Sequence, residues 1–242
     1  MILWPQADGT VLATPQPAHA VLSGQVMRHM MPRPEPFDAV VNAAAQHDCA
    51  WQPWEAAPDF DATTGLPVAF NDLPGDRHVA LWEKGVESAL ASWGLWEALL
   101  IMRHGSHIYR MALRSDRSPP DAAAKEAVHG YLAREKERGA EWMRRLGTTE
   151  AEVAPLSSAV ATVDGIALGL CWGKERFNCG GTMLQRTGPF AATLDPWILD
   201  VPRLEATATA LRLPARFPDA EAMREALPLA PRETLRFTLS PA

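Results

Sequence analysis

An acidic residue inside an apolar stretch is the strongest constraint on how this chain folds. Asp164 lies within Ala-Thr-Val-Asp-Gly-Ile-Ala-Leu, residues 161–168, where no other side chain is charged. We expect this stretch to belong to a helix that Thr148 or Thr149 caps and that runs to about Cys171. A buried carboxylate is costly unless it is paired or coordinates a metal. The fold must therefore bring a cation or a polar group to the middle of this helix.

The dipeptide His47-Asp48 is the second candidate group. It falls at the end of an apolar helix that we expect to begin near Phe37. An adjacent histidine and aspartate can bind one metal together, and the two oxygens of the Asp48 carboxylate can bridge two metals. Three further histidines lie on separate predicted helices, over about 17–31, 77–90 and 94–113: His19, His78 and His104.

Outside these helices, the sequence predicts a hairpin, a long loop and several shorter elements. Residues 1–14 read as a hairpin with an Asp-Gly turn. A long loop over 49–76 contains several prolines and tryptophans and is expected to pack down as a lid. Later segments are expected as follows: a polar helix at 121–146, a glycine-containing loop at 173–189, strands at 198–199, 204–211 and 235–239, and a short helix at 220–227.

These expectations define a single, mainly α domain over residues 1–242. A helical core would span residues 15–172. The N-terminal hairpin (1–14) and the C-terminal strands (190–242) would form a small β appendage.

Charge and cysteine content restrict the class of protein. The formal net charge of −6 argues against a nucleic-acid surface, which is usually basic. No apolar run is expected to reach the length of a membrane span, and the first residues do not resemble a signal peptide. The three cysteines form no CxxC pair, so the cytoplasm is the expected compartment. We expect a small-molecule substrate and neither a nucleic-acid nor a membrane partner; the oligomeric state is left open.

The order His … His-Asp … His … His … Asp, with the ligands on successive helices, resembles the pattern of a known superfamily. It is the two-metal pattern of the HD-domain superfamily of metal-dependent phosphohydrolases, and the resemblance covers roughly residues 17–172. The chain also resembles an uncharacterised bacterial family that supplies no activity. Three motifs carry that second resemblance: Gln16-Pro17-Ala18-His19-Ala20, His47-Asp48-Cys49-Ala50-Trp51 and Asp164-Gly165-Ile166-Ala167-Leu168.

The superfamily resemblance implies an HD-like helical bundle that holds two divalent transition metal ions. Fe or Mn suits such imidazole and carboxylate ligands, with Ni, Co or Zn as alternatives. The resemblance assigns His19, His47 and Asp164 to the first ion, His78 and His104 to the second, and Asp48 as the bridge. Two ions about 3.5–4 Å apart would activate a bridging water. The implied reaction is hydrolysis of a small phosphoester.

One departure puts phosphate recognition in doubt. Many HD-domain enzymes carry His-Asp-x-Gly-Lys, whose lysine contacts the anionic group of the substrate, and Trp51 stands at that position here. A cation from elsewhere would have to replace it: Lys84, Arg77, Arg103 or Arg110. We expect catalytic roles for Asp48, His107 and Lys84, and substrate-binding roles for Trp51, Trp54, Asp61 and Arg103.

Other interpretations of these residues remain open. His107 competes with His104 as a ligand, because residues three apart share a helix face. Trp51 and Trp54 suit packing as well as substrate binding, and Asp61 suits an Asx turn. The same ligand set also fits a non-heme diiron oxygenase, or a metal-binding module without turnover.

Overall fold

The computed structural model describes residues 1–114 and 122–242, so the predicted start of the polar helix at Asp121 lies outside the described residues. The helices are α1 (Gln16–Met27), α2 (Phe37–Gln46), α3 (Gln52–Glu55), α4 (Gly75–Ser92), α5 (Leu95–Arg114), α6 (Ala122–Leu146), α7 (Glu150–Cys171) and α8 (Ala220–Ala226). Short 3-10 turns are η1 (Cys49–Trp51), η2 (Phe70–Asp72) and η3 (Leu227–Leu229). The strands are β1 (Ile2–Pro5), β2 (Val11–Thr14), β3 (Phe60–Asp61), β4 (Leu66–Pro67), β5 (Arg176–Cys179), β6 (Thr182–Gly188), β7 (Ala191–Asp195), β8 (Leu204–Leu213) and β9 (Arg232–Pro241).

The long helices lie close to where apolar periodicity and caps predict them. The start of α7 illustrates why, because the side chain of Glu152 accepts a hydrogen bond of 2.8 Å from the backbone N–H of Thr149. This contact is one half of a capping box, in which the Thr149 side chain in turn contacts the backbone of Glu152. It satisfies a backbone donor at the start of the helix. Of the two predicted caps, Thr148 and Thr149, the structure has Thr149 as the N-cap, and the predicted end at Cys171 is confirmed.

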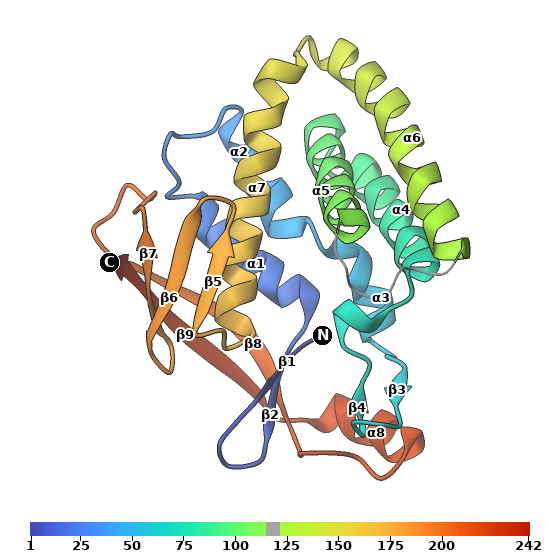
Figure 1. The fold of residues 1–242 in the computed structure, drawn as a ribbon, viewed down its shortest axis with the longest axis vertical. Coiled ribbons are helices and arrows are strands. Elements are labelled where there is room, and N and C mark those ends of the chain that lie inside the picture. The colour runs from blue at the N-terminus through green and yellow to red at the C-terminus, as the bar shows by residue number, and fades with distance from the viewer. Residues whose placement is uncertain (115–121) are drawn as a thin grey trace.

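The sheet corrects the predicted fold class. Seven strands form one mixed sheet in the order β1-β2-β8-β9-β7-β6-β5, in which β7 and β9 pair in parallel and all other neighbours are antiparallel. The protein is therefore an α/β fold, and the prediction of a mainly α bundle with a small β appendage is wrong. An all-α description fails for the same reason (Figure 1).

A missed hairpin accounts for much of this error. Residues 173–189 were expected to form a loop, but they contain β5 and β6. The two-residue turn between these strands is Gly180-Gly181, with φ angles of +66° and +108°. Paired glycines at such φ values favour the tight hairpin turns that match the twist of a sheet. The strand predicted at 198–199 reduces to one bridge between Leu199 and Met30.

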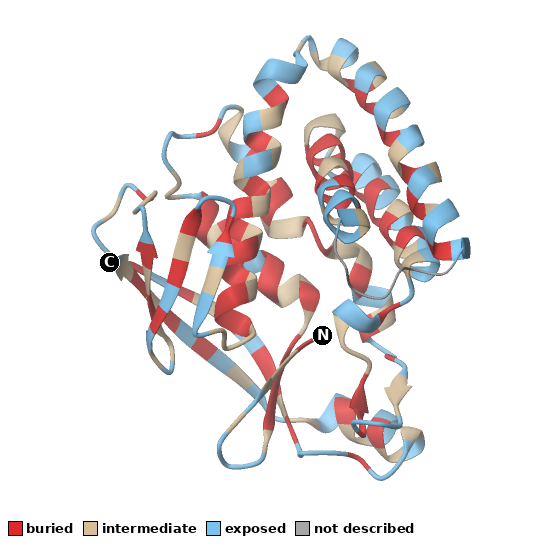
Figure 2. Cartoon of the chain, in the orientation of Figure 1, coloured by how far each residue is buried: buried red, intermediate tan, exposed pale blue. Residues whose placement is uncertain are grey.

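Helix α7 lies in the centre of the molecule, between the sheet and α5, and it also packs against α1 and α2 (Figure 1). Two glycines let β5 approach it closely. A Cβ atom on Gly165 would lie 3.2 Å from Cα of Cys179, and one on Gly169 would lie 3.2 Å from Cβ of Phe177. Buried residues accordingly line α7, α1 and the middle strands (Figure 2). Because α7 is covered on both faces, its sequence shows little separation into an apolar and a polar face.

Length and composition alone would allow α7 to cross a membrane. Its most apolar 18-residue window has a mean hydropathy of 1.5, and half of that window is buried inside the protein. The prediction that no apolar run reaches this length is therefore wrong. The core helix of a globular protein passes the same test of length and composition.

The segment 49–76 is more ordered than predicted. It contains η1, α3, β3, β4 and η2. Leu66 of β4 joins Phe217 and Met223 in a second, smaller core at the end of the sheet. The expected lid is thus anchored to the body of the protein at this point.

Candidate metal centre

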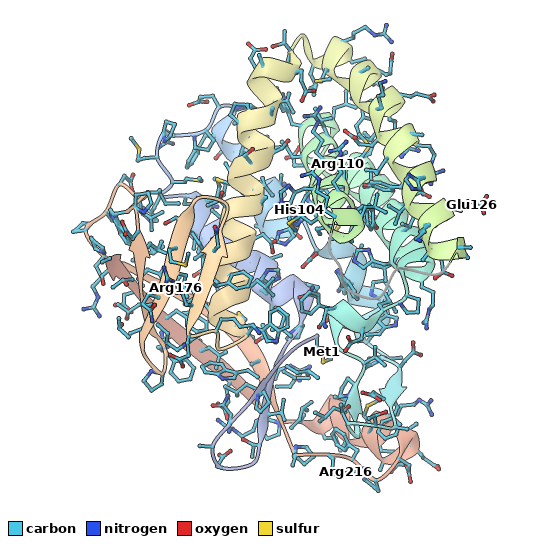
Figure 3. The ribbon with its side chains drawn as sticks, in the orientation of Figure 1. Met1, His104, Arg110, Glu126, Arg176 and Arg216 are labelled. Atoms are coloured by element: carbon cyan, nitrogen blue, oxygen red, sulfur yellow. The ribbon has the colours of Figure 1, made fainter. Side chains whose placement is uncertain are left out.

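Separate helices bring most of the predicted ligands into one place. His19 lies on α1, His47 directly follows α2, Asp48 directly precedes η1, His104 lies on α5 and Asp164 lies on α7. The three histidines and Asp48 are buried, and the Asp164 side chain is 19% exposed. Figure 3 places His104 in the interior, between α5 and α7.

The distances between these side chains are short. His19 Nε2 lies 2.8 Å and His47 Nε2 lies 3.3 Å from the same oxygen, Oδ1 of Asp164. Asp48 Oδ2 lies 3.2 Å from His19 Nδ1 and 3.4 Å from His47 Nε2. Ligand atoms of His19, His47 and Asp164 all lie within 4.8 Å of one another, which is a suitable arrangement around one ion.

Backbone contacts decide which ring nitrogens face the centre. Nδ1 of His47 lies 2.8 Å from the carbonyl oxygen of Ala44, and Nδ1 of His19 lies 3.2 Å from that of Gln16. A carbonyl oxygen only accepts hydrogen bonds, so each Nδ1 carries a proton. In a neutral imidazole, Nε2 of His47 then has a lone pair directed toward carboxylate oxygens. This is how ligating histidines are held in metal sites. Nδ1 of His19 also lies 3.2 Å from Oδ2 of Asp48, so both ring nitrogens of His19 face carboxylates.

Lone pairs facing carboxylate oxygens at these distances need a positive charge between them. Nε2 of His47 is buried and has no hydrogen-bond partner within the described residues. Burial by itself lowers the pKa of His19, but hydrogen bonds to Asp164 and Asp48 outweigh it and raise that pKa to about 9. Burial raises the pKa of Asp164, yet the hydrogen bond with His19 and the close approach of His47 hold it well below its usual range. Without a metal, a proton supplies the charge; the same donors fit a divalent transition metal ion.

His104 borders this group. Its Nε2 lies 3.6 Å from Oδ2 of Asp164, and its Nδ1 is buried without a hydrogen-bond partner within the described residues. Burial lowers the pKa of His104 to about 4, so the ring is neutral at pH 7. A neutral imidazole beside the carboxylate is available as a metal ligand.

His78 is held in different surroundings. Its Nδ1 lies 2.8 Å from the Tyr109 hydroxyl, and its ring packs 5.2 Å from that of Trp51 and stacks at 5.4 Å on that of Trp82. Burial lowers the pKa of His78 to about 4. Within the described residues, His78 is not part of the possible metal-binding group of His19, His47 and Asp164. Sequence reasoning missed Tyr109 and Trp82, which carry no spacing signal for this contact.

The predicted substrate-binding and catalytic residues are dispersed. Arg103 and the exposed His107 line a groove between α5, α6 and α7. Trp51 is buried and packs against Trp54 at 5.4 Å, which fits a packing role. Lys84 is exposed and lines a second groove with Trp54, away from the His19 and Asp164 side chains.

Asp61 has a local role. Its carboxylate accepts hydrogen bonds of 2.8 Å from the backbone N–H of Thr63 and from the hydroxyl of Thr64. These contacts close the turn between β3 and β4, as an Asx turn does. Within the described residues, Asp61 contacts none of the predicted ligands.

Gly24 allows the helices that carry His19 and His47 to approach each other. A Cβ atom at Gly24 of α1 would lie 2.5 Å from Cβ and 3.0 Å from Cα of Ala45 on α2. The crossing of α1 and α2 is therefore too close for any side chain at residue 24. This glycine is part of the site's architecture, although it touches no ligand.

We expect Gly24→Ala to destabilise the protein by about 1–3 kcal/mol, because overpacking outweighs the gain in helix propensity. The matched control is Gly130→Ala on α6, where a Cβ atom would approach only the flexible end of Arg134. That change should be neutral or stabilising by up to about 1 kcal/mol. Urea unfolding of both variants tests this, and equal effects would contradict the close crossing.

Comparison with known proteins gives a family but no function. Neither the curated proteins nor the solved structures include a match to this chain. A family model described as a protein of unknown function, DUF3891, matches residues 1–215. The match spans β1 through β8 and includes all of the candidate ligands. The chain therefore belongs to the DUF3891 family of proteins of unknown function.

Proposed function

We propose that this protein is a metal-dependent hydrolase that acts on a small phosphoester, with distant kinship to the HD-domain superfamily. The observation that carries the proposal is the convergence of two histidine Nε2 atoms on one oxygen of Asp164. Both imidazoles are oriented by their own backbone carbonyl contacts. Surface histidines that happen to lie near an acid would not need this arrangement.

His19, His47 and Asp164 would hold an ion, with Asp48 beside them. A bound divalent ion would supply Lewis acidity and lower the pKa of a water molecule. The protein's part is positional: Nδ1 protons donated to carbonyl oxygens fix the rings, and burial excludes bulk water. His104, whose Nε2 lies 3.6 Å from Oδ2 of Asp164, is placed to serve as a further ligand beside this carboxylate.

The resemblance implies a second ion, for which the described geometry gathers fewer ligands. His104 lies beside Asp164, whereas His78 is bound to Tyr109 and packed among aromatic rings. We therefore propose one primary ion at His19, His47 and Asp164. Metal analysis should give about one ion per chain if this proposal holds. It should give about two if the chain has the complete two-metal site of the HD-domain superfamily.

Support for an anionic substrate comes from the groove next to α5 and α7. It is lined by Arg103, Arg110, Lys136 and His107, four groups that carry or can carry positive charge. His107 follows His104 by one helical turn on α5, and the lining of the groove includes none of the candidate ligands themselves. Trp51, in place of the lysine of the superfamily, is buried and offers no cation.

The test is hydrolysis of bis(p-nitrophenyl) phosphate and p-nitrophenyl phosphate by protein loaded separately with Mn, Fe, Co, Ni or Zn. We expect turnover with at least one metal, and its loss in His47→Ala. His129→Ala, which alters an exposed residue of α6, is the control and should retain turnover. An absence of hydrolysis with every loaded metal would reject the proposal.

A further inference from the structure

The groove between α5, α6 and α7 contains a network of charged side chains that the metal centre does not use. Its volume is about 550 Å³. One arginine of the network, Arg103, is only 14% exposed, and its buried Nε has no hydrogen-bond partner within the described residues. That Nε lies 3.7 Å from the carboxylate of Glu135, too far for a hydrogen bond, so the guanidinium is incompletely satisfied. Its two terminal N–H groups face Glu150.

The two glutamates of the groove differ in exposure. Glu135 is buried, with its side chain 5% exposed; it accepts a 2.9 Å hydrogen bond from Arg110 and lies 3.7 Å from Nε of Arg103. Glu150 is 61% exposed and makes a two-pronged contact with the guanidinium of Arg103. Glu135 is thus a fixed part of the groove, whereas the Glu150 side chain is free to move into solvent.

The contact between Arg103 and Glu150 has the geometry with which arginine binds anions. A guanidinium presents parallel N–H groups to two oxygens of a carboxylate or phosphate. An ion pair with an exposed glutamate contributes little stability, so an incoming anion can replace it. The Glu150 carboxylate therefore marks the position of an anionic ligand.

The rest of the lining indicates what else the ligand carries. Leu132, Ala140 and Met143 of α6 and Ala154 of α7 form an apolar wall, and Lys136 and His107 add cationic groups. Neither Lys136 nor His107 makes an ion pair within the described part of the chain. An inorganic ion would use the cations and leave the apolar wall uncovered.

We infer that this groove binds the phosphoryl group of an organic phosphate, with Arg103 as the anchor and Glu150 as a competing internal anion. The inference rests on the proposed function, because it assigns the recognition of the substrate to this groove. Arg103 then takes the part of the missing lysine. The organic portion of the ligand would lie against Leu132 and Met143.

The test is calorimetric titration of phenylphosphonate, a non-hydrolysable organic probe, into protein treated with EDTA. We expect binding in the millimolar range or tighter, with a Kd for inorganic phosphate at least about threefold weaker. Glu150→Gln should lower the Kd of phenylphosphonate about three- to fivefold, because it removes the competing charge. Arg103→Lys should raise the Kd about tenfold, because it loses the two-pronged geometry.

Glu141→Gln is the matched control, because Glu141 is also an exposed partner of an arginine, Arg144, but lies outside the groove. It should leave the Kd unchanged. Thermal unfolding of each variant checks folding, and the surface change Glu150→Gln remains informative if Arg103→Lys is unstable. An unchanged or raised Kd in Glu150→Gln would overturn the inference.

The same titrations separate this inference from the proposed hydrolase. Asp164→Asn removes a metal ligand but leaves the groove intact, so it should still bind phenylphosphonate. Phenylphosphonate binding that depends on Arg103, in a protein that binds no metal, would support the groove and reject the hydrolase. If the protein binds metal but neither Glu150→Gln nor Arg103→Lys changes the Kd of phenylphosphonate, the groove inference would be overturned and the proposed hydrolase would stand.

Discussion

Asp164→Asn is expected to weaken metal binding by more than about 100-fold. Changes to residues that merely orient ligands typically cost 10- to 100-fold in metal affinity, and a direct ligand should cost more. The substitution also removes the negative charge that both His19 Nε2 and His47 Nε2 approach within 3.3 Å. Metal content after dialysis, measured by inductively coupled plasma mass spectrometry, would report the loss. The fold should persist, because asparagine has nearly the same shape.

A matched comparison makes this result specific. Asp200→Asn alters another aspartate that lies close to a histidine, His29 at 2.9 Å, but on the surface of the protein. It should leave the metal content unchanged. Equal metal content in the wild type and both variants would show that the His19, His47 and Asp164 group is only a buried ion pair.

Arg186→Ala is expected to destabilise the protein by about 3 kcal/mol or more. The guanidinium of Arg186 donates to four backbone carbonyl oxygens: Gly169, Leu170, Lys174 and Pro189. Two of these belong to the last turn of α7, where a cation is favourable. Hydrogen bonds from a charged group contribute about 1.5–3 kcal/mol each, and an alanine would leave buried carbonyls without donors.

Differential scanning calorimetry would measure this change. For a chain of this size, a loss of 3 kcal/mol corresponds to a fall in Tm of roughly 10 °C. Arg176→Ala on the neighbouring strand β5 is the control, because Arg176 is exposed and makes no ion pair within the described residues. That control should change stability by less than about 0.5 kcal/mol. Similar Tm values for both variants would mean that Arg186 does not cap α7.

The helices and the histidines and aspartates on them were accessible to sequence reasoning because both rest on local patterns. The apolar spacing of α5 and the cap of α7 involve residues three or four positions apart. A charge such as Asp164 is conspicuous in an apolar helix without any knowledge of its neighbours. The positions of His19, His47 and Asp48 at or near helix ends follow from the same local signals.

The size of the sheet could not be predicted from local sequence patterns. The short strand β7 pairs in parallel with β9, which begins 37 positions after β7 ends, and the partner of Ala191 is Thr238. Such pairing depends on the meeting of distant segments, and a short strand carries little periodic signal of its own. The Gly180-Gly181 turn was the one local signal for the β5–β6 hairpin, and it was interpreted as a loop.

The sequence by itself predicted the helical segments and grouped His19, His47, Asp48 and Asp164 together with His78 and His104. Only the tertiary structure decided which ring nitrogens face the carboxylates, that His78 binds Tyr109, and that Arg103 binds Glu150. The physical reason is that helix formation depends on neighbouring residues. A side chain's contacts depend on how closely helices such as α1 and α2 approach, and here Gly24 and Ala45 set that distance.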